Sequence, residues 1–161
     1  MSTAGNKGPD RVRQALTAAG LEVQVSELPE STRTAAEAAR AVDCAVGQIA
    51  KSLVFKGKSG TAYLVIASGS NQVDIAKLTH LIDEKADLAD PDFVREQTGF
   101  AIGGVPPLGH RVPLPTLFDE DLLQFDEIWA AAGSPRAVFP IDPAVIIETT
   151  NAQVVEIRQE T

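Results

Sequence analysis

Two neighbouring apolar segments, residues 49–55 and 61–67, constrain the fold of this chain more than any other part of its sequence. In the second segment, side chains on both faces of a strand are apolar, as Leu64 on one face and Val65 on the other illustrate. Such a strand is typical of a sheet interior that is covered on both sides. Residues 56–60 are rich in glycine and charge and predict a hairpin turn, which makes the two strands neighbours.

Helix and strand signals alternate along the rest of the chain. Thr34 and Glu37 match a capping box at the start of a helix, and Gly99 is a stop signal at the end of another. The patterns predict helices over residues 9–19, 35–42, 74–82 and 91–98, with another starting at 142–143, and further strands over 21–25, 100–102, 113–119, 127–132 and 137–140. Residues 154–157 are expected as a small strand or a docked tail. A turn or short helix is expected over 119–126. We expect an α/β fold of the α+β kind, with a mixed sheet and surrounding helices.

Length and composition favour a single domain over residues 9–161, preceded by a disordered leader over 1–8. The sequence has neither an apolar export signal nor an apolar run of membrane-spanning length, so we expect a cytoplasmic protein without a membrane partner. Its net charge of −8 argues against broad binding to DNA or RNA, although one end of an RNA could still be bound in a small basic pocket.

Lys51 stands in the apolar row of the first strand, next to Ile49 and Leu53. A lysine is costly there unless it is paired or reaches a cavity. One interpretation is an edge strand whose lysine extends to water. The other, which an interior strand supports, is a lysine that points into a pocket.

The segment Gly99–His110 is the second candidate site. Gly103 and Gly104 lack Cβ atoms, so a ligand can approach their N–H groups closely, and Pro106 and Pro107 stiffen the chain that follows. The ordinary interpretation, a tight loop between two strands, stays open.

Other polar residues have ordinary interpretations that suffice by themselves. Ser70 lies in a polar break, residues 68–71, for which a solvated turn is favoured over a ligand-facing loop. Asp142 is placed to cap a helix before Pro143. His80 is expected at the surface or core edge, and Cys44 as a small buried filler.

Common catalytic motifs are missing from the sequence. With one cysteine and two distant histidines, neither a disulfide, a Ser or Cys triad nor a histidine-based metal site is expected, and phosphate-binding and dinucleotide-binding loops are not found. We therefore expect no metal and no cofactor. The remaining groups, an ammonium and backbone N–H groups, suit the hydrolysis of an activated ester by water.

Ile49–Leu53, followed by Thr98–Gly109, resembles the YbaK-type, prolyl-tRNA synthetase-associated (INS-like) aminoacyl-tRNA editing domain. Residues 116–119 and 133–136 fall where that family has its next strand and a late glycine turn. The resemblance covers residues 10–158 and implies a mixed α/β domain that hydrolyses the ester of mischarged tRNA, chiefly tRNA(Pro) carrying a wrong small amino acid such as Ala, Cys, Ser or Thr.

The resemblance also implies roles for single residues. Lys51 would orient the terminal adenosine of the tRNA, and Gly103 and Gly104 would lie near the aminoacyl carbonyl. Gly133 and Asp142 correspond to a late glycine and aspartate of the family. As substrate-binding candidates we add Val105, Pro106, Ser70 and His110, the last without an assigned role.

The expected partner is the CCA end of a mischarged tRNA, with prolyl-tRNA synthetase as a second candidate. Two classes of function remain open. The first is a trans-editing deacylase, and the second is a non-catalytic module of the same fold that binds tRNA or a synthetase.

Overall fold

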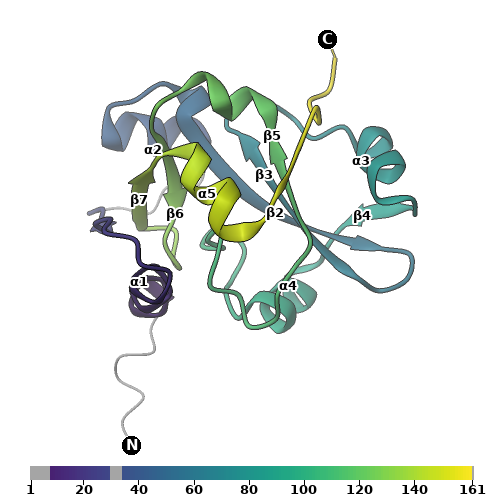
Figure 1. Ribbon diagram of the computed structural model, residues 1–161, viewed down its shortest axis with the longest axis horizontal. Coiled ribbons are helices and arrows are strands. Elements are labelled where there is room, and N and C mark those ends of the chain that lie inside the picture. The colour runs from purple at the N-terminus through teal and green to yellow at the C-terminus, as the bar shows by residue number, and fades with distance from the viewer. Residues whose placement is uncertain (1–7, 30–33, 161) are drawn as a thin grey trace, which may run out of the picture.

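The protein folds around one mixed sheet that carries helices on both faces (Figure 1). The computed structural model describes residues 8–29 and 34–160. The leader expected over 1–8 lies outside these residues except for Gly8, where the first helix begins. The helices are α1 (Gly8–Ala18), α2 (Ala35–Val42), α3 (Ile75–Ile82), α4 (Pro91–Thr98) and α5 (Pro143–Thr150), with short 3-10 helices η1 (Val46–Gln48) and η2 (Glu120–Gln124).

The sheet has the strand order β1-β7-β6-β2-β3-β5-β8, and β4 pairs with β2 beside this path. Its strands are β1 (Ser26–Glu27), β2 (Ile49–Gly57), β3 (Ala62–Ser68), β4 (Ala86–Leu88), β5 (Thr116–Asp119), β6 (Ile128–Ala131), β7 (Ala137–Ile141) and β8 (Gln153–Val155). The β2–β6, β3–β5 and β5–β8 pairs are parallel and the others antiparallel. The predicted fold class and the central β2–β3 hairpin are confirmed.

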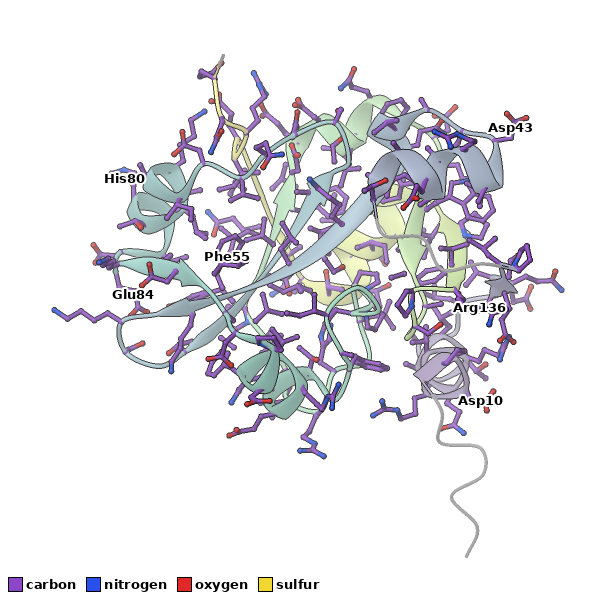
Figure 2. All side chains as sticks on the ribbon, turned by 180° about the vertical axis from the view of Figure 1, so that it is seen from behind. Asp10, Asp43, Phe55, His80, Glu84 and Arg136 are labelled. Atoms are coloured by element: carbon purple, nitrogen blue, oxygen red, sulfur yellow. The ribbon has the colours of Figure 1, made fainter. Side chains whose placement is uncertain are left out.

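Each face of the sheet packs on its own set of helices. One core joins β2 residues such as Ala50 and Val54 to α1, α4 and α5. On the other face, Phe55 packs with Leu78 of α3, and Ile49 packs on α2. The figures show this arrangement from opposite sides. In Figure 1, α5 lies in front of the sheet, and in Figure 2, which views the molecule from behind, α2 lies in front and Phe55 lies inside the molecule.

Several predicted local features are confirmed. The capping box of Thr34 and Glu37 is formed with both reciprocal hydrogen bonds, each 3.1 Å long. Asp142 caps α5 by accepting a hydrogen bond from the Ala144 N–H. Gly99 ends α4 in the left-handed conformation, with φ of 84°.

Two predicted strands are wrong. Residues 21–25 keep the alternation of half-buried and exposed side chains, but strand pairing begins only at Ser26, which faces Val138 of β7. Residues 100–102 form no strand but lead into a turn that the Gly104 N–H closes on the Ala101 oxygen, because Gly99 and Gly103 both have positive φ and leave too little chain between them for a strand. β4, which the sequence patterns did not indicate, pairs with the far end of β2.

Candidate functional site

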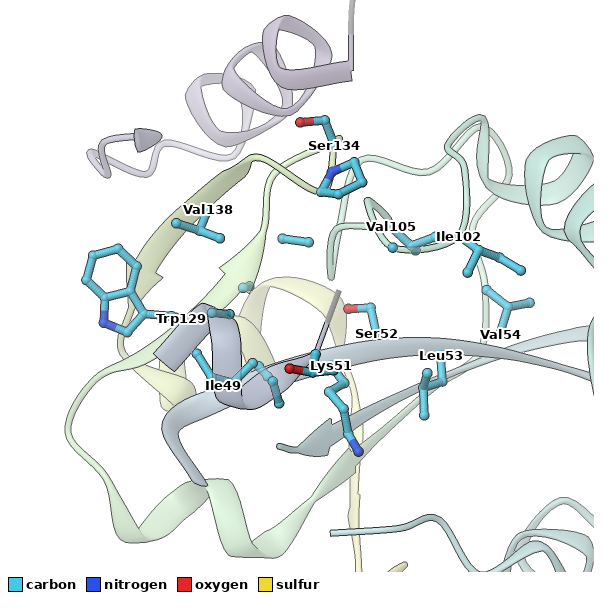
Figure 3. Close-up of a pocket in the computed structure, with 18 of the residues that line it drawn as sticks. Ile49, Lys51, Ser52, Leu53, Val54, Ile102, Val105, Trp129, Ser134 and Val138 are labelled. Atoms are coloured by element: carbon cyan, nitrogen blue, oxygen red, sulfur yellow. The ribbon is translucent and has the colours of Figure 1, made fainter. Parts of the chain in front are cut away.

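A cavity of about 310 Å³ lies beside the central strand β2 and is lined mostly by apolar side chains. β2 contributes one wall, and α2, the loop that contains Gly103, and the β6–β7 hairpin contribute the others (Figure 3). Leu88 and Ile102 belong to the lining but remain 64% and 54% exposed, so they lie at its mouth. The cavity is of a size that accepts a single small organic group.

The cavity exists because β2 lacks a neighbour along part of one edge. β3 pairs with the full length of the other edge. On the cavity edge, β6 pairs with Ile49 and Ala50, and β4 pairs with residues 55–57. Among the described residues, no strand pairs with residues 51–53 on this edge.

The main chain of Ser52 is directed toward this open edge. In an antiparallel pair, alternate residues direct their N–H and C=O groups to the same neighbour. The Ile49 carbonyl accepts a hydrogen bond from Gly69 N–H, so odd-numbered residues of β2 face β3 and even-numbered residues face the cavity edge. The Ser52 Oγ is buried and has no hydrogen-bond partner in the described part of the chain. Sequence reasoning missed Ser52, although its place next to Lys51 puts it on the opposite face of the strand.

Lys51 lines the cavity but directs its ammonium group away from the Gly103 loop. Figure 3 shows the side chains of Lys51 and Ser52 on opposite sides of β2, with Ser52 on the side of Val105. The Lys51 Nζ donates a 2.6 Å hydrogen bond to the main-chain oxygen of Asn71. Burial lowers the pKa of Lys51, and the carboxylate of Asp119 acts in the opposite direction.

Of the two glycines, Gly103 is the one that offers a backbone donor. Its N–H group makes no hydrogen bond to another described residue, whereas the Gly104 N–H donates to the Ala101 oxygen at 3.0 Å. Gly104 packs instead against the β6–β7 turn, where its oxygen accepts a hydrogen bond from Gly133 N–H. A Cβ atom on Gly104 would lie 2.7 Å from the Cα of Ser134, so this glycine permits close packing of two loops.

The structure brings together only part of the predicted site. Lys51, Gly103 and Val105 line the cavity, whereas the other candidates, Gly104, Pro106, Ser70, Gly133, Asp142 and His110, are not in its lining. Ser70 lies beside Ser68, with 3.1 Å between their hydroxyl oxygens. The roles assigned to all these residues stay predictions.

His110 fastens its own loop. Its Nε2 lies 2.7 Å from the main-chain oxygen of Pro106, to which it donates a hydrogen bond. Burial of the ring lowers the pKa of His110, and the bond to Pro106 opposes this shift. The other histidine, His80, is exposed in the last turn of α3, as expected from the sequence (Figure 2).

Metal ligands do not gather at any point among the described residues. No cluster of three or more His, Cys, Asp or Glu side chains is arranged there to hold a metal ion. Cys44 is half-buried rather than fully buried, and its pKa is raised by burial and by Asp43. No helix in this part of the chain is both long and apolar enough to cross a membrane.

Comparisons with known proteins agree with this architecture. Residues 29–149 match the aminoacyl-tRNA editing domain family. A solved structure described as a candidate trans-editing enzyme for prolyl-tRNA synthetase superposes with a TM-score of 0.91 at 51% identity, covering 95% of this chain and 98% of that one. The uncharacterized protein YwhH of Bacillus subtilis is 32% identical over 143 residues, which are 89% of this chain and 91% of YwhH.

The multifunctional Ser/Thr-tRNA deacylase ProXp-y of Escherichia coli is 35% identical over 112 residues, which are 66% of this chain and 64% of that relative. The matches place the protein in the class of hydrolases that cleave the ester bond of aminoacyl-tRNA. The chain belongs to the aminoacyl-tRNA editing domain family. The resemblance seen in residues 49–53 and 98–109 is thereby confirmed.

Proposed function

We propose that the protein is a trans-editing deacylase that hydrolyses the ester of tRNA(Pro) carrying a wrong, small amino acid. The observation that carries this proposal is the cavity at the open edge of β2. It is mostly apolar, is of a size for one aminoacyl group, and is lined in part by Lys51 and by Gly103, whose N–H makes no hydrogen bond to another described residue.

The chemistry required is modest. An aminoacyl ester is already activated, so water can attack it without a protein nucleophile, provided that the developing negative charge is stabilised by hydrogen-bond donors. The free N–H of Gly103 could supply such a donor. The Lys51 ammonium has three N–H donors, of which the Asn71 oxygen accepts one, so the others could bind the sugar or phosphate next to the ester.

The choice of substrate rests on two supports. A synthetase site rejects near-isosteric amino acids poorly, so a second hydrolytic site is needed for fidelity. ProXp-y is named for action on Ser- and Thr-tRNA, and a structure with 51% identity is described as a candidate trans-editing enzyme for prolyl-tRNA synthetase. We therefore propose mischarged tRNA, bound through its CCA end, and prolyl-tRNA synthetase as the partners, and we propose the cytoplasm as the location of the protein.

One observation favours the alternative of a non-catalytic module. The Lys51 ammonium and the Gly103 loop lie on opposite faces of β2, so they do not converge on one point without movement of the lysine. A module of this kind would bind the CCA end without cleaving the ester.

A deacylation panel separates the two functions. tRNA(Pro) charged with Ala, Cys, Ser, Thr or Pro is incubated with the protein, and release of the amino acid is measured. We expect hydrolysis of at least one mischarged species and sparing of the Pro ester. Lys51→Ala should slow this release by at least about a hundredfold, because a positioning charge is lost from a sheltered site.

Lys85→Ala is the matched control, since Lys85 is an exposed lysine outside the cavity lining and should leave the rate unchanged. Absence of release from every mischarged tRNA at micromolar protein would favour the binding module. Equal rates for Lys51→Ala and wild-type protein would remove Lys51 from the site.

A further inference from the structure

Asp119 is a completely buried carboxylate at the end of β5. Its Oδ2 accepts hydrogen bonds from the Ser68 N–H at 3.0 Å and from the Asn71 side-chain amide at 2.9 Å. Its Oδ1 accepts from the Asp121 N–H at 2.9 Å. Within the described residues, no Lys, Arg or His lies within ion-pair distance of this carboxylate.

The burial of Asp119 is costly, because a buried charge without a contacting counter-charge is stabilised only by its hydrogen bonds. A helix can be capped equally well by an exposed aspartate, as Asp90 and Asp142 do at the starts of α4 and α5. Capping of η2 therefore does not account for a carboxylate at this buried position, and the other groups that it binds must be considered.

Asn71 connects Asp119 to Lys51. Its side-chain amide donates to Asp119 and also to the Oδ2 of Asp121 at 2.8 Å, and its main-chain N–H donates to the Ser68 oxygen at 3.0 Å. Its main-chain oxygen accepts the 2.6 Å hydrogen bond from Lys51 Nζ. Two carboxylates thus fix the residue that holds the ammonium group.

The charges around this cluster come from several elements. Asp119 lies on β5 and Asp121 and Glu120 lie on η2. Arg158, from the C-terminal segment, pairs with Asp121 at 3.1 Å and with Glu120 at 3.4 Å. Arg158 therefore balances the charge of the η2 carboxylates. Lys51 is the cation on which the negative charge of Asp119 acts.

We propose that Asp119 is a positioning residue for Lys51, and that it acts by fixing Asn71, whose main-chain oxygen holds the ammonium group of the lysine. The inference rests on the function proposed above, because Lys51 is its candidate substrate-orienting group. Asp119 would not touch the substrate. Its effect would be to keep the lysine charged and at one place beside the open edge of β2.

The experiment first measures the protonation of the Lys51 amine and then measures the deacylation rate. The pH dependence of labelling by an amine-reactive anhydride, read by mass spectrometry on the peptide that contains Lys51, reports the protonation of this amine. In Asp119→Asn the lysine loses its nearby negative charge, so its pKa falls and the midpoint of labelling moves to lower pH. The deacylation rate should fall about tenfold to hundredfold, and the limb of its pH profile that reports Lys51 should move to lower pH as well.

Two further variants keep the test decisive. Asn71→Ala retains the main-chain oxygen but loses both side-chain hydrogen bonds, and it should lower the rate in the same direction, to a smaller extent. If Asp119→Asn does not fold, Asn71→Ala alone tests the proposal. Asp74→Asn is the matched control, because it alters a capping carboxylate on α3 and should change neither the labelling midpoint nor the rate.

The inference is overturned if the labelling midpoint does not fall in Asp119→Asn and its rate equals that of Asp74→Asn. It is equally overturned if Asp119→Asn does not fold and Asn71→Ala labels and reacts like the wild type. Failure of the wild-type protein to release any amino acid would instead reject the proposed function, and the labelling comparison would still decide whether Asp119 holds Lys51.

Discussion

His110 couples the stability of the Pro106–His110 loop to pH. Its ring is partly buried and donates to the Pro106 oxygen, and burial lowers its pKa in the folded protein. The unfolded chain has an ordinary histidine pKa of about 6.5 and binds the proton more readily. Stability is therefore complete above this value and falls as the pH is lowered through it.

We expect the melting temperature to fall between pH 7.5 and pH 5.5, roughly the range on either side of the ordinary histidine pKa. In His110→Gln this fall should be smaller, because the titrating group is gone. His80→Gln is the matched control, since it removes the other histidine of the chain and should leave the fall intact. Parallel pH dependence in wild-type protein and His110→Gln would exclude His110 as its source.

Burial also explains why Lys51 could be chosen as a candidate from the sequence and Asp119 could not. A lysine in an apolar row of a strand contradicts its surroundings and is visible in the sequence. Asp119 follows Phe118 at a strand end, where an aspartate is unremarkable as a cap of η2. Its burial depends on Ser68 and Asn71, which lie about fifty residues earlier in the chain.

Among the structural elements, the loops around Gly104 and Ser134 support the site by packing on one another. Gly104→Ala would place a Cβ atom 2.7 Å from Ser134 Cα and 2.8 Å from its nitrogen, both of them main-chain atoms that cannot rotate away. We expect the free energy of unfolding to fall by about 3 kcal/mol, as in overpacked cores. Deacylation should fall with it, because Gly103 moves with the loop.

Gly60→Ala supplies the comparison for this variant. Gly60 has φ of 91°, but no atom lies within 4 Å of the position that an added Cβ would take, so only backbone strain of about 1 kcal/mol is expected. Urea unfolding of the two variants separates clash from strain. Equal losses in both would show that the Gly104 loop relaxes freely and that its packing on Ser134 is unimportant.

The elements themselves were largely predictable from sequence because their signals are local. The capping box of α2, the prolines that begin α4 and α5, and the alternation of β2 and β3 each depend on a few adjacent residues. The strand expected at Phe100–Ile102 is absent because the glycines on either side of it set the local backbone conformation. Two glycines with positive φ override the β preference of three apolar residues.

At the scale of the whole molecule, the net charge limits how the protein can bind a tRNA. With a net charge of −8, it cannot neutralise a long stretch of phosphates. If the tRNA is bound mainly through its end, about two phosphates are contacted, and raising the salt from roughly 50 to 200 mM should weaken binding only about tenfold.

Fluorescence anisotropy with labelled tRNA(Pro) measures this salt dependence. A loss of about a thousandfold over the same range would mean that an extended basic surface contacts the tRNA. A minihelix that retains only the acceptor end should bind about as well as the full tRNA, and much weaker binding of the minihelix would contradict recognition of the CCA end alone.

The cavity could not be predicted from sequence, because it is assembled across the whole molecule. Its walls come from α2, β2, the end of β4, the Gly103 loop and the β6–β7 hairpin, which are separated by up to about a hundred residues. Which residues line it depends on where β6 and β4 stop pairing with β2. That register is a property of the folded sheet, and no local pattern encodes it.

The interrupted pairing of β2 has a consequence for how the protein behaves in a crowded cell. An unpaired strand edge on a protein surface can recruit strands from other molecules and seed aggregates. Here the unpaired part is three residues long, about 10 Å, and it is bounded at one end by β6 and at the other by β4. A foreign strand is too long to enter such a gap, whereas one aminoacyl group fits. The protein thereby keeps main-chain hydrogen-bonding groups available to a small ligand while its central strand stays inaccessible to other polypeptides.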